Sequence, residues 1–133
     1  MIDLTKFIGL PYKHMGRDFN GVDCFGLCWL IYSDYLKIEI PHFLEIQYTK
    51  NWYDTGKNHI LENVYWVEKV NFPYQKFDGL LFIINNNIVN HIGLYIGNNK
   101  FIHIFDGITS RIERLNRYWS NRLYSGMRFI KNG

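Results

Sequence analysis

The sequence predicts an α+β domain in which helices come first and an antiparallel sheet follows. The run from Phe25 to Leu36 is apolar on nearly every side, which is typical of a buried central helix. The later part of the chain has short apolar segments separated by turn residues, the pattern of strands. We expect these strands at about residues 80–84, 89–96, 100–105, 111–114 and 124–129. No internal repeat or low-complexity linker divides the chain, so residues 1–133 are predicted to form a single domain.

Capping and turn residues set the expected boundaries of the first helices. A short amphipathic helix is predicted from Leu4 to Leu10, with Pro11 as its stop. The carboxylate of Asp23 can accept the first amide hydrogens of the central helix, which then begins near Cys24. This helix is expected to end around Lys37.

The segment from 42 to 70 is the least informative part of the sequence. Helices are predicted at 43–48 and 59–67, with a turn at 54–58. This segment either carries substrate specificity, forms a partner surface or simply packs against the core. Further predicted features are turns at 85–87 and 106–107 and a short helical turn at 119–122.

Cys24 is a candidate nucleophile because it stands where the central helix begins. A thiol at a helix N-terminus feels a partial positive charge, which favours the reactive thiolate. The alternative is that Cys24 is a small buried apolar residue, as many free cysteines are. Cys28 is predicted to be a core residue, since cysteines four apart on one helix are poorly placed for a disulfide.

A nucleophilic thiol needs a base, and the base needs an orienting partner. His91 and His103 flank the hairpin signal Gly-Asn-Asn at 97–99. Pairing across that turn places Tyr95 opposite Phe101 or the residue after it and brings the two histidines together. One imidazole can then face the thiol while the other holds it from behind. Each histidine alone is more typical of a purely structural core or edge residue.

Composition excludes several classes of protein. The chain is 47% hydrophobic and 18% aromatic, which supports a folded core. Its net charge of +3 suits an anionic cell wall but is not a nucleic-acid-binding signature. No cysteine pair or His-x-x-x-His motif supplies zinc ligands, so we expect no metal and no other cofactor. No apolar run reaches the ~18 residues of a membrane span.

Several separated blocks, in order and spacing, resemble the NlpC/P60 family of cysteine peptidases. The blocks are Tyr12 with its neighbours, Asp23–Leu27, His91–Gly97 and Phe101–His103. Tyr12 precedes Cys24 by twelve positions, and His91 precedes His103 by twelve. The resemblance spans most of the chain, from residue 7 to about residue 105.

This resemblance implies a papain-like α+β fold, with the helix that carries the cysteine packed on an antiparallel sheet, and cleavage of peptidoglycan stem peptides. Carried across, Cys24 is the nucleophile, His91 the general base and His103 the third, orienting residue. Tyr12 and Asp23 lie beside the thiol, where they bind substrate or, for Tyr12, the oxyanion.

The chain departs from the family pattern at two places. The family usually has serine after the nucleophile, where this chain has Phe25. In members that cut next to a free N-terminal L-alanine, that serine helps to hold the amine, so the bond cut by this chain stays open. The family normally reads Gly-Asp before the first strand, and this chain has Asp78-Gly79.

Residues 112–129 are similar to the end of the compact phage-encoded branch of the family. The N-terminus lacks the basic start and long apolar core of a signal peptide. We therefore expect the protein in a phage tail or phage lysis system, with other tail proteins as candidate partners.

The sequence thus predicts a peptidoglycan hydrolase that uses Cys24, His91 and His103. Two alternatives stay open. One is an amidase or acyl transferase acting on another amide through the same residues. The other is a structural or wall-binding tail module without catalytic activity.

Overall fold

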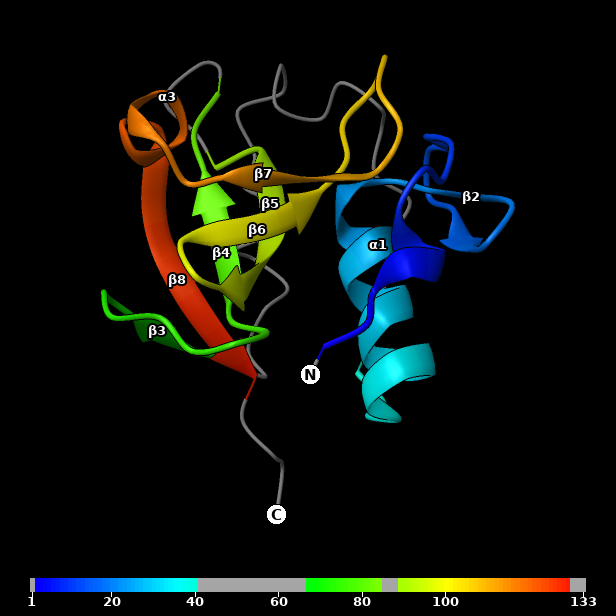
Figure 1. Cartoon of the computed structure of the whole chain (residues 1–133), viewed down its shortest axis with the longest axis horizontal. Helices are drawn as coiled ribbons and strands as arrows, with labels where there is room; N and C mark the ends of the chain where they lie inside the picture. The colour runs from blue at the N-terminus through cyan, green and yellow to red at the C-terminus, as the bar shows by residue number, and fades with distance from the viewer. Residues whose placement is uncertain (1, 41–66, 85–88, 130–133) are drawn as a thin grey trace.

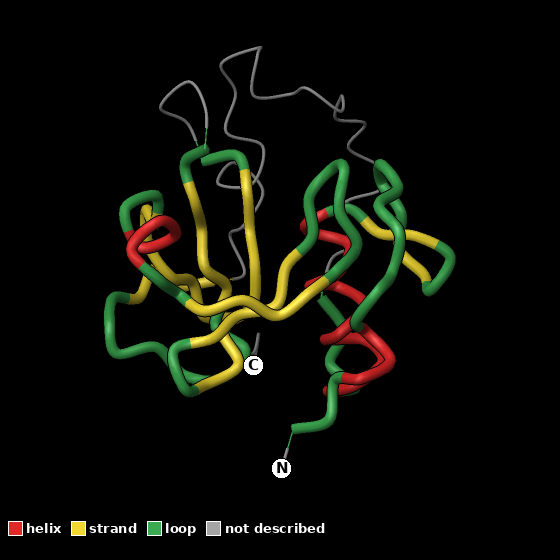
Figure 2. The backbone as a smooth tube through the Cα atoms, turned by 45° about the horizontal axis from the view of Figure 1, so that its top comes forward, coloured by secondary structure: helices red, strands yellow, loops and turns green. Residues whose placement is uncertain are grey.

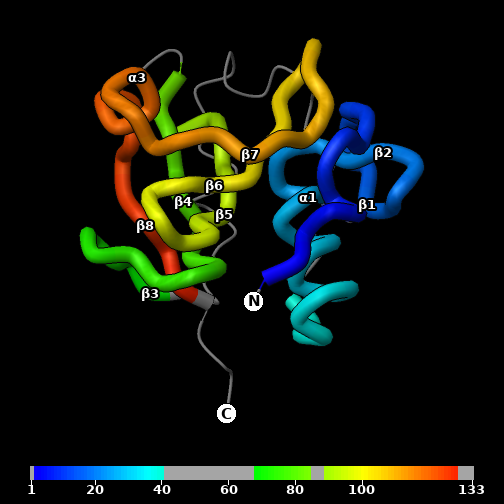
Figure 3. Tube along the Cα trace, viewed as in Figure 1, coloured from blue at the N-terminus to red at the C-terminus, as the bar shows by residue number. Residues whose placement is uncertain are grey.

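The computed structural model describes residues 2–40, 67–84 and 89–129 of the chain. Within these residues the longest helical segment precedes the main sheet, and it lies beside that sheet (Figure 1). Colouring by secondary structure shows the strands of the main sheet on one side of the helical region, with one further short helix beside the sheet (Figure 2). The chain passes through the helical region before it enters the sheet (Figure 3). The predicted α+β class is confirmed.

The helical region contains one long helical segment. A 3-10 turn η1 (Thr5–Phe7) and a two-stranded ladder of β1 (Arg17–Asp18) and β2 (Gly21–Val22) precede it. Helix α1 (Cys24–Leu30) continues as the π-helical η2 (Ile31–Leu36). The segment ends at Lys37, whose φ of 58° is left-handed. The predicted central helix and both of its ends are therefore confirmed.

The sheet has six antiparallel strands in the order β3-β8-β4-β5-β6-β7. Their bounds are β3 (Val67–Val70), β4 (Gly79–Phe82), β5 (His91–Gly97), β6 (Lys100–His103), β7 (Arg111–Arg114) and β8 (Leu123–Phe129). A short helix α3 (Arg117–Ser120) lies between β7 and β8, near the predicted helical turn.

The predicted hairpin joins β5 to β6. Asn98 and Asn99 have φ angles of 53° and 60°, and a two-residue type I′ turn requires positive φ at both positions. The ladder pairs Tyr95 with Phe101, as the turn position predicts. The two asparagines, which tolerate the left-handed conformation, form the turn, and an irregularity between Tyr95 and Gly97 then shifts the pairing by one residue to the observed register.

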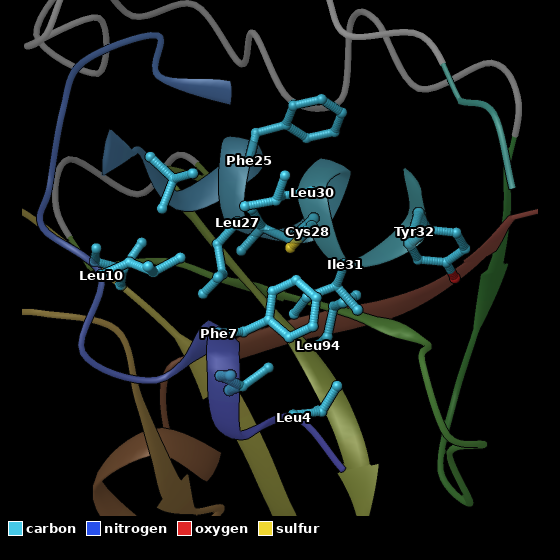
Figure 4. Close-up of a cluster of buried hydrophobic side chains, with 14 of the residues drawn as sticks. Leu4, Phe7, Leu10, Phe25, Leu27, Cys28, Leu30, Ile31, Tyr32 and Leu94 are labelled. Carbon is cyan, nitrogen blue, oxygen red and sulfur yellow. The ribbon is translucent and has the colours of Figure 1, made fainter. Parts of the chain in front are cut away.

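The two faces of the sheet bury two separate apolar clusters. Alternate residues such as Leu81, Ile92 and Ile102 face α1 and η1 and complete the larger cluster. Figure 4 shows the larger cluster, in which Phe7, Leu27 and Leu94 come from η1, α1 and β5. The smaller cluster, on the other face, consists of Leu80, Phe82, Phe101, Leu115 and Trp119. Each fully buried large apolar side chain contributes roughly 1.5–3 kcal/mol, so both faces hold the sheet in place.

The exchanged pair Asp78-Gly79 has a structural role at the start of β4. Asp78 is buried and accepts hydrogen bonds from Arg128 Nε and Nη2 at 2.9 and 2.8 Å, which ties β4 to β8. A Cβ at Gly79 would lie 2.9 Å from Cγ of Met127. With the order Asp-Gly, the carboxylate of Asp78 reaches Arg128, and Gly79, which has no side chain, packs its backbone against Met127.

Some expected elements differ from those observed. The helix predicted from Leu4 to Leu10 is limited to η1, because Gly9 turns the chain with a φ of +84°. The helix predicted over 59–67 is wrong at its last residue, since Val67 begins β3 and pairs with β8. The elements predicted at 43–48, 54–58, 59–66 and 85–87 lie outside the described residues. Among the helices that the structure does describe, none is both long and apolar enough to span a bilayer.

Candidate active site

Cys24 is the first residue of α1, and its side chain is half-buried. The backbone N–H groups of Ile92 and Phe25 both donate to its sulfur. The β5–β6 ladder begins at the pair Leu94–Ile102, so Ile92 lies beyond it and its N–H is directed at the thiol instead. The helix start is thereby placed against the beginning of β5.

The thiol is protonated in the resting protein. Burial, and then the negative charge of Asp23, raise the pKa of Cys24 to about 12, against the smaller opposite effects of the two N–H groups and Arg17. The N–H of Phe25 at the helix start lowers the pKa of the thiol, as expected, but desolvation of the sulfur outweighs it. Cys28, one turn later, is fully buried in the larger cluster as predicted, and both cysteines are free.

Asp23 is the N-cap of α1, as predicted. Its Oδ1 accepts from Gly26 N at 2.8 Å and from Arg17 Nη1 at 2.9 Å, and its Oδ2 accepts from Met15 N at 2.9 Å. The residue is 3% exposed. Its carboxylate therefore fixes the helix start and the preceding loop, and its contact with substrate stays a prediction.

Tyr12 lies beside the strand that leads to the nucleophile. It forms an isolated parallel bridge with Val22, supported by hydrogen bonds from Lys13 N to Val22 O at 2.9 Å and from Val22 N to Pro11 O at 3.1 Å. Its half-buried ring packs against the larger cluster. The backbone thus places Tyr12 beside Val22, two residues before Cys24, and the role of its hydroxyl stays a prediction.

The two histidines meet, as the hairpin predicts. His91 Nε2 lies 2.8 Å from His103 Nδ1, and the residues are 2% and 0% exposed. Gly93 makes room for this contact, because a Cβ there would lie 2.9 Å from the Phe101 ring and 3.1 Å from His103 Cβ. Cys24 and His91 both lie in the described part of the chain, and no hydrogen bond joins them. Hydrogen bonds between a catalytic nucleophile and its base are often long until substrate binds.

Aromatic rings surround the histidine pair and keep it neutral. Trp119 lies 4.8 Å from the His103 ring and 5.8 Å from the His91 ring, and Phe105 lies 5.7 and 5.9 Å from them. Burial, and then the neighbouring His103, hold the pKa of His91 well below its usual value. Burial and Arg111 lower the pKa of His103 to about 3. In the resting protein the thiol and both imidazoles are therefore neutral.

Glu113 contacts the site although the sequence did not indicate it. Its Oε2 lies 2.5 Å from His103 Nε2, the nitrogen that faces away from His91. Side chains alternate between the two faces of a strand, so a strand at residues 111–114 could have indicated that Glu113 lies on the face that carries the histidines. The loop from 104 to 110 left the register of that strand open, so the contact could not be predicted.

A profile of the NlpC/P60 family matches residues 9–128, which include every candidate site residue. The chain belongs to the NlpC/P60 family. The resemblance seen in the sequence is thereby confirmed at the level of the family.

The similar NlpC/P60 proteins include a "Probable endopeptidase NlpC homolog" from Haemophilus influenzae, 29% identical over 127 residues that cover 95% of this chain and 58% of the relative. A "Probable peptidoglycan endopeptidase LytE" from Bacillus subtilis is 28% identical over 96% of this chain and 33% of the relative. The chain thus spans less than two thirds of either relative.

A solved structure of an NLP/P60-family lipoprotein-like protein from Staphylococcus aureus superposes with a TM-score of 0.64 at 26% identity, over 96% of this chain and 39% of that one. The arrangement of α1 on an antiparallel sheet is therefore the NlpC/P60 fold. Among the described residues of the present chain, no group of three His, Cys, Asp or Glu side chains is arranged to hold a metal ion.

Proposed function

We propose that this chain is a cysteine peptidase that hydrolyses an amide bond in peptidoglycan stem peptides. The observation that carries the proposal is the buried His91–His103 pair at 2.8 Å, with the Cys24 sulfur held against Ile92, the residue after His91. Membership of the NlpC/P60 family and the chain's similarity to an endopeptidase homolog and a peptidoglycan endopeptidase support the same substrate class.

The reaction begins with transfer of the Cys24 thiol proton to Nδ1 of His91 as the sulfur attacks the amide carbonyl. The carbonyl π electrons move to the oxygen, and the backbone N–H of Cys24 stabilises this oxyanion, with Tyr12 as a second candidate donor. This N–H belongs to the first turn of α1, where the helix supplies no acceptor. His103 holds the His91 ring through Nε2.

The intermediate collapses when His91 returns the proton to the amine, the C–N bond breaks and a thioester remains on Cys24. Water then attacks the thioester, with its proton passing through His91 to the sulfur, and the product carboxyl group is released. The pKa of Cys24 is raised and that of His91 is lowered. Proton transfer from Cys24 to His91 therefore accompanies the attack on the carbonyl.

Incubation of the purified protein with defined muropeptides tests this function. We expect mass spectrometry to show two fragments whose masses add up to the stem peptide plus one water. Release of intact stem peptide from the lactyl group would instead assign an amidase, the alternative that the sequence left open. Intact muropeptides of every wall type tested would contradict an enzymatic role and favour a structural wall-binding module.

We propose further that the protein acts from a phage tail or phage lysis system. Support comes from the resemblance of residues 112–129 to the phage-encoded branch of the family; these residues include α3, which packs Trp119 against the histidines. We expect peptides of this chain in mass spectra of purified phage particles. Their absence from particles, together with their presence in lysates, would contradict the tail location and leave the lysis system.

A further inference from the structure

We propose that Glu113 is a positioning residue of this site, which fixes the tautomer of His103 and thereby determines which nitrogen of His91 is the base. The inference rests on the proposed function. It follows from one chain of contacts, in which Glu113 Oε2 lies 2.5 Å from His103 Nε2, and His103 Nδ1 lies 2.8 Å from His91 Nε2.

The sheet register directs Glu113 to His103. β7 pairs with β6 so that Glu113 lies opposite Phe101, and Arg111 lies opposite His103. Glu113 is therefore a diagonal neighbour of His103 on the same face of the sheet, a separation that a long side chain spans. His103 is fully buried while the Glu113 side chain is 34% exposed, so the carboxylate links the buried ring to the surface.

The donors and acceptors in this chain of contacts determine which ring nitrogen of each histidine carries a hydrogen. A carboxylate can only accept, so Nε2 of His103 must carry the hydrogen that Glu113 receives. His103 is neutral, so its Nδ1 is then an acceptor, and Nε2 of His91 must donate to it. The lone pair of His91 is thereby left on Nδ1, the nitrogen available to take the thiol proton.

Without the carboxylate, the opposite arrangement becomes equally accessible. His103 can then carry its hydrogen on Nδ1 and donate to Nε2 of His91, which moves the His91 hydrogen to Nδ1 and removes the base. Two charged side chains lie next to His103 in the described part of the chain: Glu113 and Arg111, both on β7. The ring of His103 otherwise contacts His91 and aromatic side chains. Arg111 cannot replace Glu113, because a guanidinium only donates.

Glu113→Gln tests the inference, because glutamine keeps the size of the side chain but its amide can donate as well as accept. The matched control is Glu68→Gln, which removes one exposed carboxylate from β3 at the opposite edge of the sheet. The first readout is independent of activity: nitrogen-15 NMR of labelled imidazoles at neutral pH. We expect His91 as the Nε2–H tautomer in the parent and in Glu68→Gln, and a mixture of tautomers in Glu113→Gln.

The second readout is hydrolysis of the muropeptide that the parent cleaves. We expect kcat to fall roughly 10- to 100-fold in Glu113→Gln with KM unchanged, the scale on which outer partners of a functional imidazole act. Glu113→Asp keeps the charge and should restore part of the loss. A purely structural role would instead lower the melting temperature and leave the tautomer unchanged.

These outcomes separate the two proposals. An unchanged His91 tautomer in Glu113→Gln, with kcat equal to that of Glu68→Gln, overturns the role of Glu113. An inactive parent whose His91 tautomer still changes in Glu113→Gln contradicts the proposed function but supports the positioning role.

Discussion

Replacement of Cys24 by alanine is expected to lower the rate of stem-peptide hydrolysis by about five to six orders of magnitude. The substitution removes the atom that forms the thioester, and loss of a covalent nucleophile has this scale of effect in comparable triads. Release of muropeptide fragments, followed by liquid chromatography over hours to days, measures both proteins. Substrate affinity should change little, because the substitution removes only one atom from the site.

Cys28→Ala provides the matched control for this experiment. Cys28 lies on the same helix, one turn after Cys24, and is fully buried in the larger cluster. Its replacement leaves a small cavity, so it should lower the melting temperature while the hydrolysis rate stays within a few-fold of the parent. Equal rates for the parent and Cys24→Ala would show that the hydrolysis does not pass through this thiol.

The elements that the sequence predicted well are those whose signal is local. Asp23 lies directly before an apolar run, and it caps α1 as expected. Asn98 and Asn99 form the tight turn of the hairpin, and an irregularity between Tyr95 and Gly97 completes the register that brings His91 to His103. The cap and the turn are each determined by a few adjacent residues, so no distant contact is needed to predict them.

The features that the sequence did not reveal depend on contacts between distant segments. Val67 begins a strand because β8 offers it an open edge, which overrides the helical spacing before it. The contact of Glu113 with His103 requires the register of β7, which follows an irregular loop. The pKa of Cys24 depends on how deeply the folded chain buries the sulfur. The position of Cys24 at the start of a helix does not reveal that burial.

Lowering the pH from 7 to 4 is expected to reduce the free energy of unfolding by up to about 3 kcal/mol through His103, because the nearby Glu113 carboxylate opposes part of the shift. In the unfolded chain this ring has an ordinary pKa near 6.5, whereas burial and Arg111 lower the pKa of the folded ring to about 3. As the pH falls through that interval, the unfolded state binds a proton that the folded state does not. Stability is therefore fully present above pH 6.5 and declines by about 1 kcal/mol for each unit below it, until the folded ring also protonates.

His91 adds to the same loss, because its pKa is also lowered in the folded protein. Urea unfolding at pH 7, 5.5 and 4 measures the total, and His103→Gln isolates one contribution. A glutamine carbonyl can accept from Nε2 of His91 and its amide can donate to Glu113, so both hydrogen bonds can form without a titrating ring. We expect the variant to lose less stability than the parent over this interval, by up to about 3 kcal/mol. Identical acid dependence in the two proteins would mean that His103 is protonated as readily in the folded chain as in the unfolded one, and the aromatic rings around it would then not exclude water from the pair.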